Sequence, residues 1–338
     1  MSAETIIGKQ SIQFREPPHI VSAASVVGKK ESEGPLGRLF DQVEEDPMVG
    51  QASWEEAESA LQKKAARLAM EKAGPGVPPV RYLFSGDLLG QLIATSFGVI
   101  DLKLPLFGLY GACSTIGEAL MLGAMTVQGG YSEAVLALTS SHFGSAEKQF
   151  RYPLEYGGQR PLSATWTVTG SGAFVLARSG GKARITGATP GKVVDYGLKD
   201  SMNMGACMAP AACDTICTHL EDFGRQPSDY DCIVTGDLGS VGQRILLELA
   251  SERGYDLEGR HQDCGMLIFD PETQDTHAGG SGCACSAVTL AAYLLPKLEK
   301  GQWKQILFVP TGALLSTVSY NEGQSVPGIA HAVVIEHC

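Results

Sequence analysis

The residue whose type and position most suggest chemistry is Cys113, in the stretch GLYGACSTIGEALMLGAM that runs from Gly108 to Met125. This stretch is typical of a buried strand end, a tight Gly-Ala turn and a long apolar helix that begins at the cysteine. A thiol at a helix N-terminus faces unpaired N–H groups and the positive end of the helix dipole, which lower a cysteine pKa and favour a bound anion. Cys113 is therefore a candidate nucleophile or ligand contact. The alternative is a small buried residue in a crowded turn.

The other cysteines do not predict a metal or redox site. The chain has nine cysteines and no C-x-x-C pair, so neither a zinc ribbon nor a thioredoxin-like site is supported. Cys283 and Cys285 lie two residues apart, and Cys213 and Cys217 share a helix face without further ligands. We expect reduced thiols in a cytosol-like compartment and no resident metal or other cofactor.

Composition excludes several classes of protein. The 338 residues are 44% hydrophobic and 19% charged, as in a globular protein with a large core. The net charge of −11, without a local Lys/Arg block, argues against nucleic acid and against adhesion to anionic lipid. No apolar run reaches the ~18 residues of a membrane span. The residues MSAETIIGKQ do not read as a signal peptide.

Predicted strands and helices alternate along the chain, which indicates α/β layers. Ser53, with Glu56 in the capping-box position, is predicted to begin a helix over 54–73. Further helices are expected over 91–98, from 113 onward, and over 206–223, 241–253 and 283–300. Strands are expected over 8–14, 19–27, 80–85, 104–109, 133–139, 164–177, 183–194, 230–235, 266–269, 305–310 and 330–336.

Four short sequence segments of the first half of the chain have similar counterparts, in the same order, in the second half. The parallel segments are YLFSGDLLG at 82–90 with CIVTGDLGS at 232–240, GACSTIGEA at 111–119 with GCACSAVTL at 282–290, SEAVLALTS at 132–140 with KQILFVPTG at 304–312, and SGAFVLARS at 171–179 with AHAVVIEHC at 330–338. Four matches in one order predict an internal duplication, with one half over 1–180 and the other over 181–338. Loops at the carboxyl ends of strands in both halves would then meet at one shared site.

With these residues in view, the chain resembles the thiolase superfamily, and Gly111-Ala112-Cys113-Ser114 resembles the segment that carries its nucleophilic cysteine. This resemblance implies a five-layered α/β/α/β/α fold of two duplicated halves. A closer resemblance, to the stage V sporulation protein AD family, covers essentially the whole chain. It rests on GPLG at 34–37, SGDLL at 85–89, SSH at 140–142, QFRYPLEYGGQ at 149–159, TVTGSGA at 167–173, AGGSGCACSAV at 278–288 and TGALLS at 311–316.

The catalytic groups that the superfamily resemblance implies are incomplete. Condensing enzymes of this fold need the cysteine, a histidine with an asparagine or second histidine from the second half, and an oxyanion hole. Where the ketoacyl synthase pattern has its histidine, after the strand over 232–235, this chain has Gly236-Asp237. Where the pattern has asparagine, Cys283 opens the helix. An aspartate near Cys113 would raise the thiol pKa by like-charge repulsion, which opposes acylation.

A pocket retained without the chemistry could hold a flat aromatic dicarboxylate. Its predicted contacts are the two helix starts, Asp237 and the backbone of the final turn. These residues are Cys113, Ser114, Asp237, Gly282, Cys283, Thr311, Gly312 and Ala313. His142 is either a ligand contact or a buried structural histidine. His261 lies too far past its strand for a catalytic role.

Other charged residues leave alternatives open. Arg151 and Arg160 could each pair with a ligand carboxylate, or could tie their segment to a subunit interface. Proteins of this superfamily are usually dimers, and the resemblance implies a homodimer joined along a first-half strand such as 133–139. Asp87 and Asp237 are either turn residues or would meet a calcium ion that accompanies the ligand.

The family resemblance implies a function in sporulation. It implies a non-catalytic subunit that binds dipicolinic acid (pyridine-2,6-dicarboxylic acid), or its calcium chelate, for uptake into the developing spore. The implied partners are membrane-embedded subunits of the stage V complex, which would hold this soluble, cytoplasmic-side chain at the inner spore membrane. A thiolase-fold acyltransferase that uses Cys113 is the alternative from another class, and a scaffold with a vestigial pocket is a third.

Overall fold

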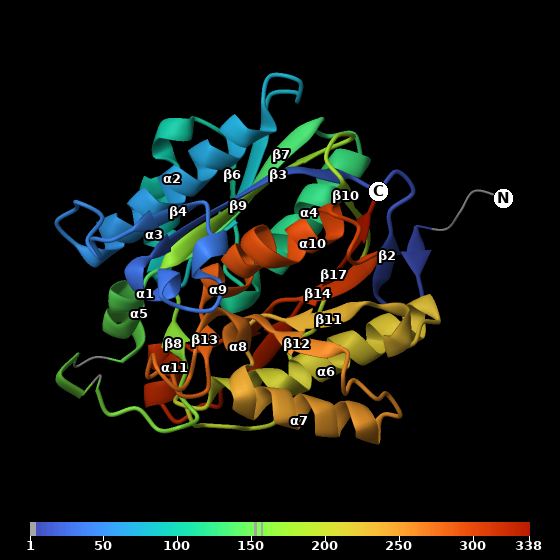
Figure 1. Ribbon diagram of the computed structural model, residues 1–338. Helices are drawn as coiled ribbons and strands as arrows, with labels where there is room; N and C mark the ends of the chain where they lie inside the picture. The colour runs from blue at the N-terminus through green and yellow to red at the C-terminus, as the bar shows by residue number, and fades with distance from the viewer. Residues whose placement is uncertain (1–4, 152–153, 157) are drawn as a thin grey trace.

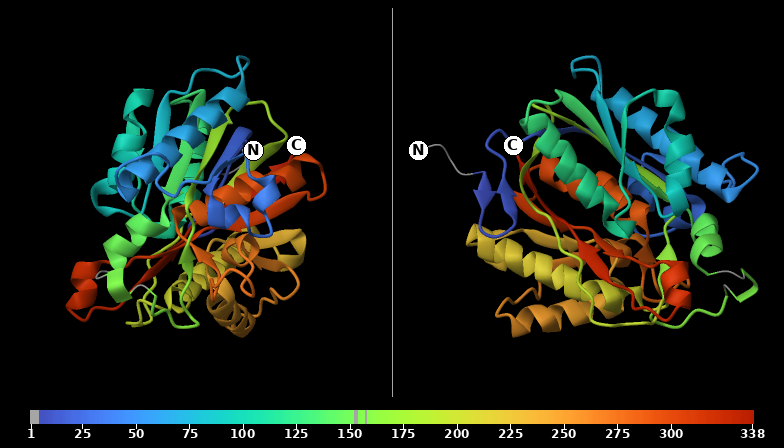
Figure 2. Two further views of the ribbon diagram at one scale, coloured as in Figure 1. Left: turned by 60° about the vertical axis from the view of Figure 1, so that its left-hand side comes forward. Right: turned by 180° about the vertical axis from the view of Figure 1, so that it is seen from behind.

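The architecture is two similar mixed half-sheets with layers of helices outside and between them. The computed structural model describes residues 5–151, 154–156 and 158–338. Figure 1 shows the layers in succession: α2 and α3, the first half-sheet, the central helices α4 and α9, the second half-sheet, and α6 with α7. Figure 2 shows the same stacking from two further sides. The expected five-layered α/β fold is confirmed.

The strand order of the first half recurs in the second. The first half-sheet has the order β3-β9-β7-β5-β6, and the second has β10-β17-β14-β11-β12. In each, the first two pairings are antiparallel and the next two are parallel. These strands are β3 (His19–Gly28), β5 (Tyr82–Gly86), β6 (Leu106–Gly108), β7 (Ala134–Ser141), β9 (Gly170–Ala177), β10 (Ala183–Thr189), β11 (Cys232–Thr235), β12 (His261–Asp263), β14 (Gln305–Val309) and β17 (Ala332–His337). A short pairing of β3 with β10 joins the two half-sheets.

Shorter strands lie around this framework. They are β1 (Ile6–Ile7), β2 (Ser11–Gln13), β4 (Gln42–Glu44), β8 (Trp166–Thr167), β13 (Gly280–Ser281), β15 (Thr311–Ala313) and β16 (Gly328–Ala330). β8 pairs with β13, and β15 pairs with β16. The single strand predicted over 164–177 is therefore two strands, because β8 leaves the main sheet to pair with β13.

Among the described residues, the helices include every one that the sequence predicts and four that it does not, over 29–32, 143–150, 264–268 and 317–321. They are α1 (Lys29–Ser32), α2 (Trp54–Ala73), α3 (Ile93–Gly98), α4 (Thr115–Gln128), α5 (Phe143–Phe150), α6 (Met204–Phe223), α7 (Gly239–Glu252), α8 (Cys264–Ile268), α9 (Cys283–Thr289), α10 (Leu295–Glu299) and α11 (Thr317–Asn321). The strand predicted over 266–269 is wrong, because α8 occupies it and the edge strand β12 comes earlier. A short apolar run does not distinguish the two by periodicity.

Local sequence explains the outer and inner helices. Ser53 Oγ accepts the N–H of Glu56, and Glu56 Oε2 accepts the N–H of Ala52, so the predicted cap of α2 is confirmed. Every residue of α9 is buried, as expected of a helix that is apolar all round and packed between two sheets. None of the helices in the described ranges combines the length and apolarity needed to cross a membrane.

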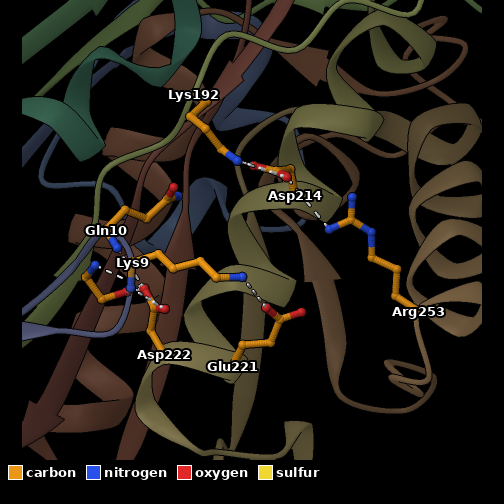
Figure 3. A network of polar contacts seen from close by, with 8 residues as sticks. Lys9, Gln10, Lys192, Asp214, Glu221, Asp222 and Arg253 are labelled. Atoms are coloured by element: carbon orange, nitrogen blue, oxygen red, sulfur yellow. Dashed lines mark hydrogen bonds and ion pairs between the residues drawn. The ribbon is translucent and has the colours of Figure 1, made fainter.

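A polar network fastens the N-terminal hairpin to α6 (Figure 3). Asp222 accepts three backbone N–H groups of the turn between β1 and β2, at 2.8–3.1 Å. The donors belong to Lys9, Gln10 and Ser11. About two turns of α6 before this hairpin contact, Asp214 pairs with Lys192 and Arg253 and so ties α6 to the end of α7. The three backbone bonds contribute more than the exposed ion pairs, which are screened by solvent.

Candidate functional site

Cys113 lies in a strained turn between the first half-sheet and α4. The preceding Ala112 has φ +51°, a left-handed conformation that is uncommon for a residue with a side chain. The turn is held because Ser114 Oγ donates to the Gly111 carbonyl and Thr115 Oγ1 donates to the Ala112 carbonyl, both at 2.6 Å. β15 passes so close that a Cβ on Gly312 would lie 2.6 Å from the Gly111 oxygen. The glycine at 312 therefore permits the contact between the halves.

Asp237, which belongs to the second half of the chain, lies near the Cys113 thiol. It lies close enough to the Cys113 thiol to raise the pKa of that thiol, accepts the Gly282 N–H at 3.0 Å and accepts the Thr311 hydroxyl at 2.8 Å. The residues come from the ends of β11 and β13 and from β15, so the predicted meeting of strand ends from the two halves is confirmed at this point. Asp237 is buried, and burial raises its pKa to about 7.

The thiol of Cys113 is not activated as a nucleophile, because its surroundings disfavour the thiolate. Burial raises its pKa well above the ordinary cysteine value, and the neighbouring Asp237 raises it further. The N–H of Gly282 lowers it only in part. The expectation that the helix start lowers this pKa is therefore wrong, whereas the expected effect of Asp237 is confirmed. Desolvation of the Cys113 thiolate and the like charge of Asp237 outweigh the stabilisation that the helix dipole offers at the start of the helix.

Cys113 forms the floor of a cavity of about 390 Å³, here called the Cys113 cavity. Of the residues predicted to bind ligand, Cys113, Gly282, Ala313 and Arg151 line it. Ser114, Asp237, Cys283, Thr311 and Gly312 lie behind its wall. Cys283 is fully buried and its thiol donates to the Ala112 carbonyl at 3.0 Å. These residues shape the cavity without facing it.

Sequence reasoning missed the apolar walls of this cavity. They include Leu88, Phe150, Leu314, Leu315 and Val318. Tyr110 stands at the mouth and is 57% exposed. None of these residue types signals chemistry by itself, and they come together only because the loop after β15 folds over α5. Among the residues that the structure describes, no histidine or asparagine lines the cavity.

One buried ion pair supplies the charge in the wall. Arg151 donates to Glu147 Oε1, and only 12% and 6% of the two side chains are exposed. Burial raises the pKa of Glu147, although Arg151 and Arg160 oppose that rise. Glu147 Oε2 is buried and has no hydrogen-bond partner among the described residues. The spacing of four residues on α5 could have indicated this pair in the sequence.

His142 and Arg160 do not reach Cys113. They line a neighbouring cavity of about 800 Å³, here called the Trp166 cavity, which shares Glu147 with the first. His142 accepts the Gly144 N–H and its Nε2 lies 2.8 Å from the Pro47 oxygen. The structure therefore separates His142 from the Cys113 cavity, where a ligand contact was predicted, and its two ring nitrogens contact backbone atoms of Gly144 and Pro47. Part of the segment 149–160 falls on residues 152, 153 and 157, outside the described residues.

Two other titratable residues singled out in the sequence are structural. Both oxygens of Asp87 are occupied, by the N–H of Leu89, the N–H of Thr95 and the hydroxyl of Thr95, at 2.6–2.8 Å. These contacts explain its role as a turn residue. His261 lies on β12, where its Nε2 meets Thr235 Oγ1 at 2.9 Å. No group of three or more potential metal ligands occurs within the described residues.

Comparison with known proteins decides the family. The family model for stage V sporulation protein AD matches residues 8–336. Stage V sporulation protein AD of Bacillus subtilis (strain 168) is 44% identical over 331 residues, which cover 98% of each chain. The chain belongs to the stage V sporulation protein AD family. A role in sporulation follows from this membership.

Solved structures of condensing enzymes share the fold of this sporulation family member. A thiolase from Ascaris suum in complex with coenzyme A has a TM-score of 0.58 at 12% identity, over 95% of this chain and 100% of that chain. A 3-oxoacyl-(acyl-carrier-protein) synthase III from Aquifex aeolicus has a TM-score of 0.55 at 13% identity, over 95% and 100% of the two chains. At these identities the likeness establishes the thiolase-like fold and carries no activity to this chain.

Proposed function

We propose that this chain is a non-catalytic subunit that binds dipicolinic acid in the Cys113 cavity and serves its uptake into the developing spore. The observation that carries the proposal is a cavity with apolar walls and a buried arginine, in a condensing-enzyme fold whose thiol is not activated. Membership in the sporulation family supports the biological setting. Membrane-embedded partner subunits would hold the chain at the inner spore membrane.

The Cys113 cavity suits a small planar anion in size and chemistry. A volume of about 390 Å³ lies in the range of about 300–1,000 Å³ typical of small-molecule sites. Phe150, Leu314 and Leu315 offer flat apolar contacts, and Arg151 offers a planar guanidinium that pairs with carboxylates. Arg151 is held by Glu147 through one nitrogen. The remaining donors of its guanidinium are therefore positioned for one ligand carboxylate.

The thiol chemistry supports binding over acyl transfer. A cysteine acts as a nucleophile only as the thiolate, and burial together with Asp237 holds Cys113 in the thiol form. The positions that follow β11 and open α9 carry Asp237 and Cys283, neither of which can act as the missing imidazole or amide. Calcium would reach the cavity only as part of a chelate, because the oxygens of Asp237 and Asp87 already accept protein donors.

Calorimetric titration of the purified chain tests the proposal. Dipicolinate is titrated with and without calcium, and benzene-1,3-dicarboxylate serves as the ligand that lacks the ring nitrogen. The double variant Glu147→Gln/Arg151→Met removes the cavity cation without leaving a buried charge unpaired. Arg38→Met, which removes an exposed arginine outside both cavities, is the matched control. Saturable binding by the wild type and Arg38→Met, with the Cys113-cavity component lost in the double variant, supports the proposal, and absence of binding by the wild type refutes it.

Acyl transfer is the second candidate because Cys113 lines the cavity and the Asp237 carboxylate is near enough to its thiol to affect the pKa of that thiol. In that reading Asp237 would accept the thiol proton, Cys113 would attack the thioester carbonyl, and the C–S bond to coenzyme A would break, so that free coenzyme A leaves as the thiol with the proton that Asp237 returns. Mass spectrometry after incubation with short acyl-coenzyme A thioesters distinguishes the candidates. The binding proposal predicts an unmodified Cys113, and a stable acyl adduct on this residue would favour the enzyme.

The proposal includes a homodimer, but through a different strand from the one expected. β7 lies between β5 and β9, and all its residues are buried, so the interface predicted along 133–139 is wrong. Within the described ranges the outer edge of β6 is unpaired. Leu106 is 39% exposed and Phe107 is 48% exposed, although both lie on a sheet edge. An apolar open edge favours pairing with a second copy of itself.

A further inference from the structure

A second cavity lies on the other side of α5 and is not used by the proposed function. The Trp166 cavity has a volume of about 800 Å³ and contains the aromatic residues Trp54, Phe143 and Trp166. Phe143 stacks on Trp166 with ring centroids 3.8 Å apart. Two cations lie over the same ring: Lys30 Nζ at 4.3 Å and Arg160 Cζ at 4.9 Å. A stacked aromatic pair with two neighbouring cations is a rigid, positively charged part of the wall.

Arg160 is held in place with one end of its guanidinium unused. Only 6% of its side chain is exposed. Its Nη2 donates to the Asp275 backbone oxygen at 3.0 Å and to Asp275 Oδ2 at 2.8 Å. Its Nη1 is buried and has no hydrogen-bond partner among the described residues. An unpaired buried donor is costly, and an anionic group in the cavity would remove that cost.

The acidic residues around this cavity are mostly engaged. Glu45 pairs with Lys29, Asp275 pairs with Arg160, and Glu147 pairs with Arg151. Glu31 is buried, accepts the Thr169 N–H at 2.9 Å, and has its pKa raised to about 7 by burial. Glu33 is exposed to solvent. Lys30 has no ion-pair partner among the described residues, although its Nζ donates to the Gln274 oxygen, and Arg160 is paired with Asp275 through Nη2 alone.

We propose that the Trp166 cavity is a second binding site for a small carboxylate, with Arg160 Nη1 as its anchor and Lys30 as its second cation. The proposal rests on the proposed function only in taking the same ligand class. Glu147 separates the two sites and lines both, and it lies close enough to Arg160 for that cation to lower its pKa.

Tryptophan fluorescence and stoichiometry together test this site with dipicolinate as the probe. The chain has three tryptophans, two of which, Trp54 and Trp166, line the Trp166 cavity, and the Cys113 cavity has none. In a Trp303→Phe background, fluorescence therefore reports on the second site. Equilibrium dialysis counts the ligand bound per chain. We expect two equivalents, one of which is accompanied by a fluorescence change.

Variants assign the two equivalents. Arg160→Met should weaken the fluorescence-linked equivalent by about tenfold or more, the loss expected for a charge-assisted hydrogen bond, and leave the other unchanged. Lys30→Met should weaken the same equivalent if Arg160→Met does not fold. Glu147→Gln/Arg151→Met should have the opposite selectivity. A single equivalent that responds to Arg151 and not to Arg160 would overturn the second site and leave the proposed function intact, whereas no binding at all would overturn both.

Discussion

Replacing Glu147 by glutamine should strengthen ligand binding at the Cys113 cavity. The Glu147 carboxylate already neutralises Arg151 and would lie beside the incoming ligand carboxylate. At a separation of about 6 Å and an effective dielectric constant of about 20, two like charges repel by about 2–3 kcal/mol. Solvent in an open cavity reduces this by about half, which leaves a dissociation constant about fivefold to tenfold lower in Glu147→Gln.

Calorimetry with dipicolinate measures this change. Glu155→Gln is the matched control, because it removes one exposed carboxylate of the neighbouring segment and gives the same change in net charge. The control should bind as the wild type does. If Glu147→Gln binds dipicolinate more weakly than the wild type while its thermal stability is unchanged, Glu147 orients the ligand instead of competing with it, and the reasoning is refuted.

The same residue gives the binding a pH dependence with a definite sign. Burial raises the pKa of Glu147, so its carboxylate becomes protonated at a higher pH than an exposed glutamate does. Protonation removes the competing charge, and wild-type affinity should therefore rise as the pH falls from 8 towards the raised pKa. Glu147→Gln should lack this component over the same range. A parallel pH profile for the two proteins would contradict the assignment.

Three further changes test other parts of the structure. Asp237→Asn should lower the pKa of Cys113 and so raise its alkylation rate at pH 8, as measured by mass spectrometry, because it removes the like charge beside the thiol; an unchanged rate would mean that burial alone protects the thiol. Gly312→Ala should lower the free energy of unfolding by about 1–3 kcal/mol in chemical denaturation, because its Cβ would meet the Gly111 oxygen at 2.6 Å, and an unaltered midpoint would contradict that contact. Phe107→Glu should convert a dimer into a monomer in light scattering, and a dimer that persists would place the interface away from β6.

More of the fold than of the candidate site could be predicted from the sequence. The repeated Gly-Asp pairs and helix starts predicted a duplicated fold, and the two half-sheets have the same strand order. A pattern that recurs in both halves of the chain supports the same element twice, so it identifies that element even where one stretch is ambiguous by itself. The strand predicted over 266–269 failed because a five-residue apolar run packs equally well in a short helix such as α8.

Site residues were predictable where they are fixed by the backbone and not where they depend on packing. Cys113, Gly282 and Ala313 were found because helix starts and strand ends are visible in sequence, and Arg151 because arginine suits a carboxylate. Their burial was not visible, so desolvation, the largest cause of the raised Cys113 pKa, was missed, although the effect of Asp237 was predicted. The apolar walls of the Cys113 cavity come from segments that are distant in sequence. That Glu147 lines both cavities is visible only in the folded structure, where α5 contributes residues to each cavity.

The most direct test of the central claim is the heat of binding of dipicolinate to the purified chain. The account predicts saturable binding to the wild type, weaker binding of benzene-1,3-dicarboxylate, and loss of the Cys113-cavity site in Glu147→Gln/Arg151→Met. Binding that is unchanged by the double variant would place the ligand away from Arg151. No heat with dipicolinate, with or without calcium, would contradict the claim that this fold retained its cavity for a dicarboxylate.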